Sequence, residues 1–332
     1  MSRNSSTLKQ KWEKAKSQYS ILLVLGFLIV VSSLINPNFL TGANLSNVSR
    51  QISVTTILAF GETILIICGL IDLSSGSVLA LSGVLSVSVF KMTGSLSLAF
   101  VVAIAVAVLA NFINGLMVTR FRTPPFIATL AMQAMARGAA LLYTNGQNIY
   151  QIEGYTVFGQ GSIGFVPTPV VFLIVLFAAT WYLLRHTRFG RSLFAIGGNE
   201  EAAIASGINV NRNKMTAFLV NGVLVGIAGV LFMSRVNSGL PNGAINYEFQ
   251  ALTSSIIGGT SFSGGIGTAG GTVAGAFIVG FLNNIMNLAN VNSYMQQIAR
   301  GAIIALAVMW DIWTKNKRTR AHTGRIEDQK GA

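Results

Sequence analysis

The run LSLAFVVAIAVAVLA, residues 96–110, contains no charged residue and decides what kind of fold this chain adopts. Further uncharged runs cover residues 21–31, 170–184 and 302–310. With their flanks, several of these runs approach the length of about 20 apolar residues that a helix needs to cross a hydrocarbon core. Of the 332 residues, 52% are hydrophobic and 10% are charged. The sequence therefore predicts an all-α, polytopic membrane bundle rather than two soluble domains.

The apolar runs predict about ten transmembrane helices. The expected crossings are residues 19–36, 51–70, 75–91, 97–119, 126–144, 167–184, 215–234, 249–262, 268–288 and 297–314. The eighth of these is the weakest, because it is short and ends in glycines, and it can instead form a broken or re-entrant helix. Eight crossings is therefore the alternative count.

The positive charges predict how the chain is oriented. The formal net charge is +13, and 18 of the 23 Lys and Arg residues are concentrated in four places. These places are residues 1–18, Arg120 with Arg122, residues 185–214 and residues 315–332. Because Lys and Arg are enriched in cytoplasmic loops, we expect both basic tails inside the cell, on either side of a transmembrane domain at residues 19–314. Charge spread over tails and loops in this way does not indicate a nucleic-acid partner.

The longest outer loop in this topology covers residues 145–166 and has no Lys or Arg. Tyrosines lie in and beside it, at Tyr143, Tyr150 and Tyr155. Because tyrosine is enriched where a membrane meets water, these three side chains are expected at the outer interface.

A thirty-residue polar segment separates two of the apolar runs. Its sequence is RHTRFGRSLFAIGGNEEAAIASGINVNRNK, residues 185–214, and it holds seven of the 33 charged residues. Asn199 is of a type that caps helix starts, and the carboxylates of Glu200 and Glu201 suit the positive end of a helix. Gly207 is suited to ending that helix. We expect a short helix here, either in a solvated loop between two spans or on a docking surface.

The stretch GLIDLSSGS, residues 69–77, places Asp72 in an apolar region. An Asp at the centre of a membrane helix costs about 2.5 to 3.5 kcal/mol on insertion scales. Asp72 is better accommodated at a helix start on the inner face, where its oxygens accept N–H bonds from residues 73–76. The other interpretation is a role in the substrate pathway or in a subunit contact. Glu62 and Arg137 are further ionisable residues within predicted spans, and they either pair or each face water.

Glycines and amides mark the later part of the chain. The stretch GGTSFSGGIG, residues 258–267, has too many glycines for an ordinary helix and predicts a tight turn or unwound segment. Small residues at a spacing of four allow two helices to approach closely, which is the role expected of Gly267, Gly271 and Gly275. Three amides follow on an apolar span, at Asn283, Asn284 and Asn287. Amides both donate and accept hydrogen bonds, which suits either sugar hydroxyls or an interhelical clamp.

The sequence offers little that would make the chain an enzyme. It contains no G-x-x-x-x-G-K-[ST] phosphate loop and no H-E-x-x-H, and its two histidines are His186 and His322. The single cysteine, Cys68, excludes a disulfide or a thiolate metal cluster within one chain and is expected to be a buried thiol. We therefore predict no cofactor and no metal. If ATP drives this protein, a separate subunit must hydrolyse it.

Four blocks, in order along nearly the whole chain, carry a resemblance to a known family. They are GLIDLSSGS at 69–77, TPPFIATL at 123–130, GRSLFAIGGNEEAAIASGINV at 190–210 and GGTSFSGGIGTAGGTVAGAFIVGFLNNIMNL at 258–288. In these blocks the chain resembles the permease subunits of bacterial ATP-binding cassette importers for monosaccharides, the ribose, xylose and galactoside group, and the ribose permeases most of all. The resemblance implies the permease architecture of the vitamin B12 importer, in the cell inner membrane.

The same resemblance implies partners and roles for residues. A second permease subunit, expected to be an identical copy, pairs in the membrane, an ATP-binding subunit docks in the cytoplasm, and a periplasmic or lipid-anchored sugar-binding protein delivers a monosaccharide. The polar segment becomes the coupling loop. Its expected contacts with the ATPase are Gly198, Asn199, Glu200, Glu201, Ala202, Ala203, Ser206 and Gly207. The expected substrate pathway contains Asn283, Asn284 and Asn287, with Asp72 ranked behind them.

Two other classes of protein fit parts of the sequence. One is a secondary transporter driven by a proton or sodium gradient, with Asp72 or Glu62 as the coupling carboxylate. This class does not account for the polar segment, and we expect no pair of broken helices of the kind that inverted repeats produce. The other is a membrane scaffold protein, which fits the composition but not the glycine-rich break. No residue selects among the sugars that related permeases carry.

Overall fold

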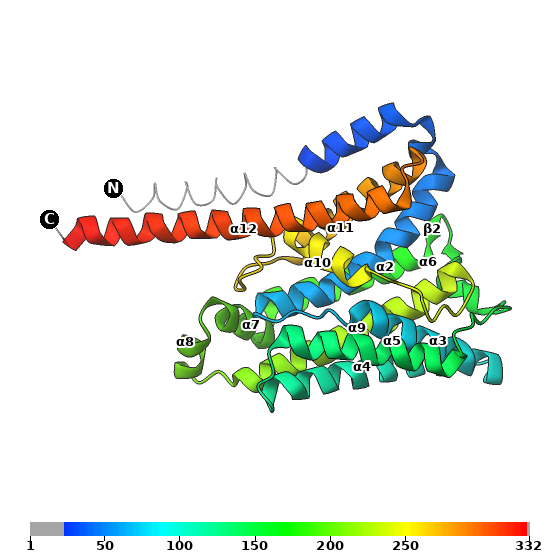
Figure 1. Cartoon of the computed structure of the whole chain (residues 1–332), viewed down its shortest axis with the longest axis horizontal. Coiled ribbons are helices and arrows are strands. Elements are labelled where there is room, and N and C mark those ends of the chain that lie inside the picture. The colour runs from blue at the N-terminus through cyan, green and yellow to red at the C-terminus, as the bar shows by residue number, and fades with distance from the viewer. Residues whose placement is uncertain (1–22, 331–332) are drawn as a thin grey trace.

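The computed structural model describes residues 23–330, and its regular structure is almost entirely helical (Figure 1). Seven of the described helices are long and apolar enough to cross a membrane. They are α2 (Gly42–Ile67), α3 (Ser75–Thr93), α4 (Leu96–Thr119), α5 (Pro125–Thr144), α6 (Thr168–His186), α9 (Val210–Val236) and α11 (Ala269–Leu288). The remaining described helices are Leu23–Ile35, η1 (Pro37–Leu40), η2 (Tyr155–Phe158), α7 (Arg188–Gly198), α8 (Glu200–Ala205), α10 (Tyr247–Ile257) and α12 (Ser293–Lys330).

The bundle has two distinct ends. Helices α7 and α8 lie at one end, on the left of Figure 1, which we call the α8 end. A small hairpin lies at the other end, which we call the hairpin end. Its strands β1 (Ser162–Ile163) and β2 (Val166–Pro167) are antiparallel, with Ser162 opposite Pro167 and Ile163 opposite Val166.

The predicted all-α membrane bundle is confirmed, with differences at three of the predicted crossings. The predicted crossing 249–262 corresponds to α10, which has only 11 residues and is about 16 Å long. It is therefore too short to cross a membrane as a helix, as its terminal glycines suggested. The first predicted crossing is described only as the helix Leu23–Ile35, and the predicted basic arm lies outside the described residues. Helix α12 includes the last predicted crossing and continues to Lys330, through most of the predicted tail.

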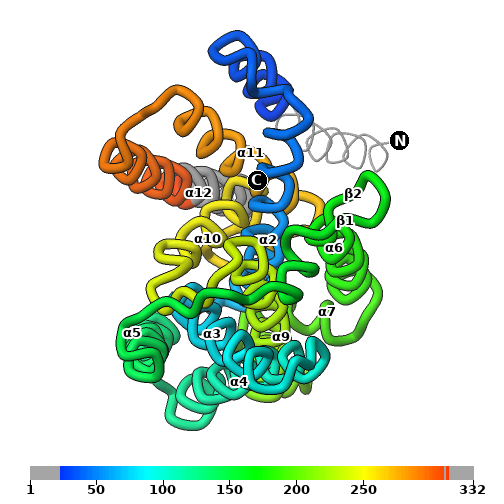
Figure 2. The backbone as a smooth tube through the Cα atoms, turned by 90° about the vertical axis from the view of Figure 1, so that its right-hand side faces the viewer, coloured from blue at the N-terminus to red at the C-terminus, as the bar shows by residue number. Residues whose placement is uncertain are grey.

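Helix α2 lies in the middle of the bundle (Figure 2). All residues from Ile52 to Cys68 are buried, which matches the expectation for Cys68. A helix buried on every side must be apolar or carry satisfied polar groups. The polar residues of α2 meet this condition in part through neighbouring helices, because the hydroxyl of Thr63 bonds Ser255 at 3.0 Å and Thr272 at 2.6 Å.

Helices α4 and α9 form the most extensive helix pair of the bundle. Ala99, Ala103 and Ala107 recur every four residues on α4 and are fully buried. Opposite them, Gly222 and Gly226 of α9 leave room for the α4 backbone. A Cβ atom at Gly222 would lie 2.7 Å from the Cα of Val108, and one at Gly226 would lie 2.7 Å from the Cα of Ile104. Small residues on both helices thus allow the two backbones to approach closely.

The three glycines predicted to form a packing ladder lie near different partners. Gly271 and Gly275 of α11 face α10, and a Cβ atom at either position would overlap the carbonyl oxygen of Gly258 or Ser254, respectively. Gly267 precedes α11, and a Cβ atom there would lie 2.8 Å from the side chain of Ile67. Two of the three glycines, Gly271 and Gly275, therefore allow α11 to lie close against α10.

Two non-helical segments interrupt the bundle. Residues 68–74 connect α2 to α3, and residues 237–246 connect α9 to α10. In each case the following helix begins inside the bundle, and a Cβ atom at Gly76 of α3 would lie 2.7 Å from the carbonyl oxygen of Ala244. We call these two segments the helix breaks. Because α2, α3 and α9 are each long enough to cross a membrane, the expectation that the chain lacks a pair of broken helices stays a prediction. The predicted crossings left residues 235–248 as a connection, but they did not show that this connection turns back into the bundle.

The connection between α5 and α6 covers the hairpin end of the bundle. Of the three tyrosines expected at the membrane interface, Tyr143 and Tyr150 are exposed, but Tyr155 is fully buried. Its hydroxyl bonds Ser86 of α3 at 2.7 Å, and its carbonyl accepts a bond from the Ser234 hydroxyl of α9 at 2.6 Å. The expectation for Tyr155 is therefore wrong, because two helices supply the partners that its polar atoms need.

The close approach of α4 and α9 predicts the effect of one substitution. Gly226→Val should lower the melting temperature of the detergent-solubilised protein, because overpacking costs about 1–3 kcal/mol. Gly301→Ala on α12 is the control, since a Cβ atom at Gly301 has nothing within 4 Å. Thermal unfolding followed by circular dichroism measures both. Equal melting temperatures for Gly226→Val and the wild type would contradict the packing argument.

Candidate functional site

Local capping builds the short helix of the polar segment. Thr187 begins α7, since its hydroxyl accepts the N–H of Gly190 at 3.0 Å. Asn199 ends α7 and begins α8, and its side-chain oxygen accepts the N–H of Ala202 at 2.9 Å. Gly207 follows α8 with a φ of +80°, a conformation that glycine adopts without strain. The N–H of Ile208 then bonds the carbonyl of Ala203, which closes a Schellman motif.

Helix α8 lies on the outside of the α8 end. Among its residues only Ala203 is buried, whereas the Ile204 side chain is 58% exposed. Glu200 forms an ion pair with Lys214 of α9 at 2.8 Å, and Glu201 is exposed. All of the expected coupling residues, 198–203 with Ser206 and Gly207, lie together on this one projection. The helix thus presents a carboxylate and an apolar side chain on a projection that another protein can reach.

Glycines connect this projection to the rest of the bundle. A Cβ atom at Gly197 of α7 would overlap the carbonyl oxygen of Ile67, the last residue of α2. That carbonyl accepts the N–H of Gly265 at 2.9 Å. A Cβ atom at Gly265 would lie 3.1 Å from the Cα of Gly198. We call the contact of these four residues the glycine junction, and it joins α7, the end of α2 and the α10–α11 connection by backbone contacts.

A second polar cluster lies inside the bundle, around Asp72. Its Oδ1 atom accepts the N–H of Ser74 at 2.8 Å and also the Ser74 hydroxyl. Its Oδ2 atom accepts from the Asn221 amide of α9 at 2.7 Å, and the same amide donates to Asn111 of α4 at 2.9 Å. Asn114 donates to the Ser74 hydroxyl at 3.0 Å. Asp72 thus ties the start of α3 to α4 and α9.

The position and neighbours of Asp72 differ partly from expectation. Its bonds with Ser74 do hold the start of α3, but Asn114 lies five residues before the end of α4, about 8 Å inside the bundle. Asp72 is therefore within the bundle and not at its inner face. Its own N–H points toward Oε2 of Glu62, at 3.4 Å.

Glu62 and Arg137 do not pair. The Arg137 guanidinium donates instead to the carbonyl oxygens of Pro241 and Gly243, at 2.6 and 2.8 Å. Among the described residues, the one ion pair within 4.0 Å is that of Lys214 with Glu200. Arg137 thus supplies hydrogen bonds to the second helix break, where the backbone lacks helical partners.

The three predicted pathway amides do not share one environment. Asn284 exchanges two amide hydrogen bonds with Asn44 of α2, at 2.9 and 3.0 Å, as an interhelical clamp does. Asn283 is buried without a side-chain hydrogen bond to the described residues. Asn44 and Glu62 are 18 residues apart on α2, or about 27 Å, so the amides and Asp72 lie far apart.

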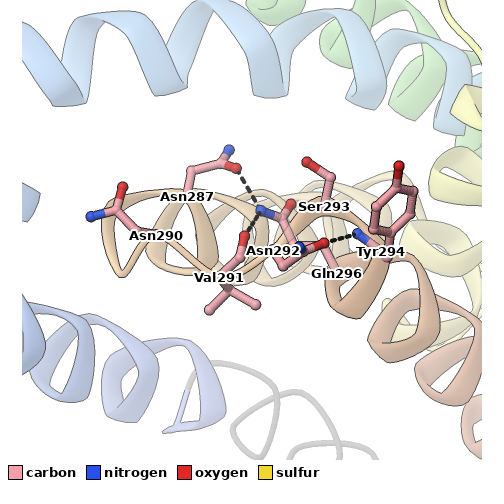
Figure 3. Close-up of a pocket in the computed structure, with 7 residues that line it drawn as sticks. All are labelled: Asn287, Asn290, Val291, Asn292, Ser293, Tyr294 and Gln296. Carbon is pink, nitrogen blue, oxygen red and sulfur yellow. Dashed lines mark hydrogen bonds between the residues drawn. The ribbon is translucent and has the colours of Figure 1, made fainter.

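Asn287 lies in an open pocket where α11 meets α12 (Figure 3). Its side-chain oxygen accepts from Gln296 at 2.9 Å, and Gln296 in turn accepts from Arg300 at 3.1 Å. The pocket has a volume of about 500 Å³. Its lining is rich in amides and hydroxyls, and Val291 supplies an apolar surface. The polar side chains are those of Asn287, Asn290, Asn292, Ser293, Tyr294 and Gln296.

The sequence analysis missed several residues of the interior. Asn111, Asn114 and Asn221 complete the cluster around Asp72, and their signal was an amide within an apolar run. Gln133 of α5 and Glu248 of α10 also bond inside the bundle, at 3.0 Å. Glu248 fell just outside a predicted span because the break before α10 was not recognised.

The fold is that of a multi-span membrane protein. A family model described as "Branched-chain amino acid transport system / permease component" matches residues 44–308, and the chain belongs to this family of permeases. It is a transport subunit and not an enzyme in its own right, as the sequence predicts.

Several relatives are similar over most of the chain. "Ribose import permease protein RbsC" of Escherichia coli (strain K12) is 41% identical over 295 residues, which is 87% of this chain and 92% of that protein. The protein of the same name from Bacillus subtilis (strain 168) is 39% identical, over 87% of this chain and 91% of that protein. "L-arabinose transport system permease protein AraH" of Escherichia coli (strain K12) is 34% identical, over 91% of this chain and 93% of that protein.

The cluster around Asp72 predicts a loss of stability when its shared amide is removed. Asn221→Ala leaves oxygens of Asp72 and Asn111 without a donor, and each buried unpaired group costs about 1–3 kcal/mol. The melting temperature of the purified protein should fall by several degrees. Asn283→Ala serves as the control, because that buried amide has no side-chain hydrogen bond to lose. If the two variants have the same melting temperature, the cluster does not hold α3, α4 and α9 together.

Proposed function

We propose that this chain is the permease subunit of an ATP-driven importer that carries a monosaccharide, ribose, across the bacterial inner membrane. The names of relatives at 38–41% identity support the substrate, since they are ribose import permeases. Arabinose permeases are less similar, at 33–34% identity. The observation that carries the proposal is an exposed, capped helix at one end of a membrane bundle.

In this proposal α8 contacts the ATP-binding subunit. The helix is fixed at both ends by Asn199 and Gly207, and it presents Glu201 and Ile204 outward. A helix held this way keeps its shape when it is pushed, because its orphan backbone groups are already paired. The residues that would make the contact are those predicted from the sequence, 198–203 with Ser206 and Gly207.

The glycine junction gives a route by which movement of α8 reaches the membrane. Backbone atoms meet there without intervening side chains, so a displacement of α7 moves the end of α2 and residues 258–268 with it. Those elements continue into α3, α10 and α11. We infer that α7, α8, the end of α2 and residues 258–268 move as one unit during transport.

The proposed assembly has three kinds of protein component. Two copies of this chain pair in the membrane, the ATP-binding subunit docks at the α8 end, and a periplasmic or lipid-anchored protein delivers the sugar at the hairpin end. Both termini face the cytoplasm, and residues 19–314 form one transmembrane domain in an architecture like that of the vitamin B12 importer. The excess of Lys and Arg in the tails and in residues 185–214 supports this orientation.

Not every predicted pathway residue is equally free to contact a sugar. The side chains of Asn284 and Asp72 form hydrogen bonds to other helices, and we propose that they hold the bundle together. Asn287 lines the open pocket and is therefore the best placed of the three amides. Asn283 is buried on α11 with its amide unengaged by the described residues.

Reconstitution tests the proposed function. Proteoliposomes containing this chain and its ATP-binding subunit should take up ribose only when ATP and the ribose-loaded binding protein are both supplied. Vanadate should stop that uptake, whereas collapse of proton and sodium gradients should not. Uptake that follows an ion gradient and needs no ATPase would instead establish a secondary transporter.

The proposed contact of α8 predicts uncoupling by bulky substitutions. Glu201→Trp, or Gly207→Val at its positive φ, should reduce ATP-dependent uptake at least about tenfold, since interface anchors contribute 2 kcal/mol or more. The protein should still insert and purify normally. Leu109→Trp, which adds the same bulk at an exposed position midway along α4, is the control and should transport normally. Normal uptake in both α8 variants would refute the contact.

A further inference from the structure

Glu248 is a buried carboxylate that lies just after the second helix break. It is the second residue of α10, and its side chain is 3% exposed. One oxygen, Oε1, accepts from the Gln133 amide at 3.0 Å. The other, Oε2, has no hydrogen-bond partner among the described residues. A buried acceptor left unpaired is costly, so such an atom in a stable fold calls for an explanation.

The first turns of two helices lie against Glu248. A Cβ atom at Gly76 would overlap Oε2, so the carboxylate lies directly against the first turn of α3. It also belongs to the first turn of α10 itself. The partial positive charges at the starts of two helices thus meet at one carboxylate. Oε2 is nevertheless left without a donor among the described residues.

Two polar residues of α5 face the same region. Gln133 and Arg137 are four residues apart and therefore lie on one side of the helix. They are eight and twelve residues from the start of α5, or about 12 and 18 Å, which places them midway along it. Both are half-buried. Arg137 and Glu248 do not approach within 4.0 Å as an ion pair, although the guanidinium acts on the carboxylate electrostatically.

Helix α5 lies at the edge of the bundle. Figure 2 shows α5, α3 and α10 on the same side of the molecule, and α5 packs mainly on α3 and α4. The hydrogen bond from Gln133 to Glu248 joins α5 to α10 across this side. The three polar groups therefore gather at the middle depth of the membrane beside a helix that is covered on only one flank.

We propose that Glu248, Gln133 and Arg137 hydrogen-bond the hydroxyls of a monosaccharide as it passes midway through the membrane. The proposal rests on the sugar-import function proposed above. A carboxylate accepts a hydrogen bond from a hydroxyl, a guanidinium donates one, and an amide does both. A neutral solute with several hydroxyls satisfies all three groups. One such contact is weak enough for release, which transport requires.

The first test separates sugar passage from ATP hydrolysis. Glu248→Gln keeps the size of the side chain and its bond with Gln133 but weakens the acceptor. In proteoliposomes whose wild-type form takes up ribose, this variant should lower the initial uptake rate about tenfold, the effect of losing one hydrogen bond to a charged group. Hydrolysis stimulated by the ribose-loaded binding protein should persist.

The outcomes distinguish this proposal from the function on which it rests. If the wild type shows no ATP-dependent uptake, the sugar-import function fails. If the wild type transports and Glu248→Gln transports equally well, the contact is wrong while the function stands. A variant in which uptake and hydrolysis fall together assigns Glu248 a structural role and also overturns the contact.

Thiol labelling gives a readout that a purely structural role would not change. The chain's only cysteine is the buried Cys68, so a single added cysteine can be followed. Gln133→Cys should react with a water-soluble thiol reagent at a rate that changes when ATP and ribose-loaded binding protein start turnover. Met135→Cys, exposed on another face of α5, should react at a constant rate. An unchanged rate at Gln133→Cys would overturn the proposal.

Discussion

The backbone at the two helix breaks must find hydrogen bonds inside a membrane, and the polar interior of this protein depends on that constraint. No water is available in the hydrocarbon core, and each unpaired N–H or C=O group there costs several kcal/mol. Before α3 the partners are carboxylates, since Asp72 accepts from Ser74 and Glu62 faces the N–H of Asp72. Before α10 the partner is a cation, since Arg137 donates to two carbonyl oxygens. The carboxylates thus face backbone N–H groups, and the guanidinium faces backbone carbonyl oxygens.

The breaks also give the bundle its mechanical layout. A continuous helix is stiff along its axis, whereas the segments before α3 and α10 are non-helical where they enter the bundle. At the α8 end, backbone contacts at the glycine junction tie α7 to the end of α2 and to the connection after α10. The elements next to the breaks are therefore the same elements that the exposed α8 reaches. This arrangement links a contact outside the membrane to the polar groups within it.

Elements that depend on residues close together in the sequence could be predicted from it. Contacts between residues far apart in the sequence could not. Asn199 and Gly207 cap and end α8 through atoms a few residues away, so their residue types alone predicted that helix. Apolar length similarly predicted the seven long spans. The bond between Asp72 and Asn221 joins residues 149 positions apart, and no periodicity shows which helix lies opposite. Pairing Arg137 with an acid failed for the same reason, because its partners are backbone carbonyls at an unrecognised break.

The central claim is that α8 and the glycine junction move together when the ATPase closes. Spin labels at Ala205 of α8 and Ile266 of the α10–α11 connection, both exposed, measure this directly. The measurement is the distance between the two labels in the assembled importer, without nucleotide and with ATP and vanadate. The account predicts the same distance in both states while the distance from either label to Thr144, at the far end of α5, changes. A change between Ala205 and Ile266 would show that α8 slides over the junction, which contradicts the account.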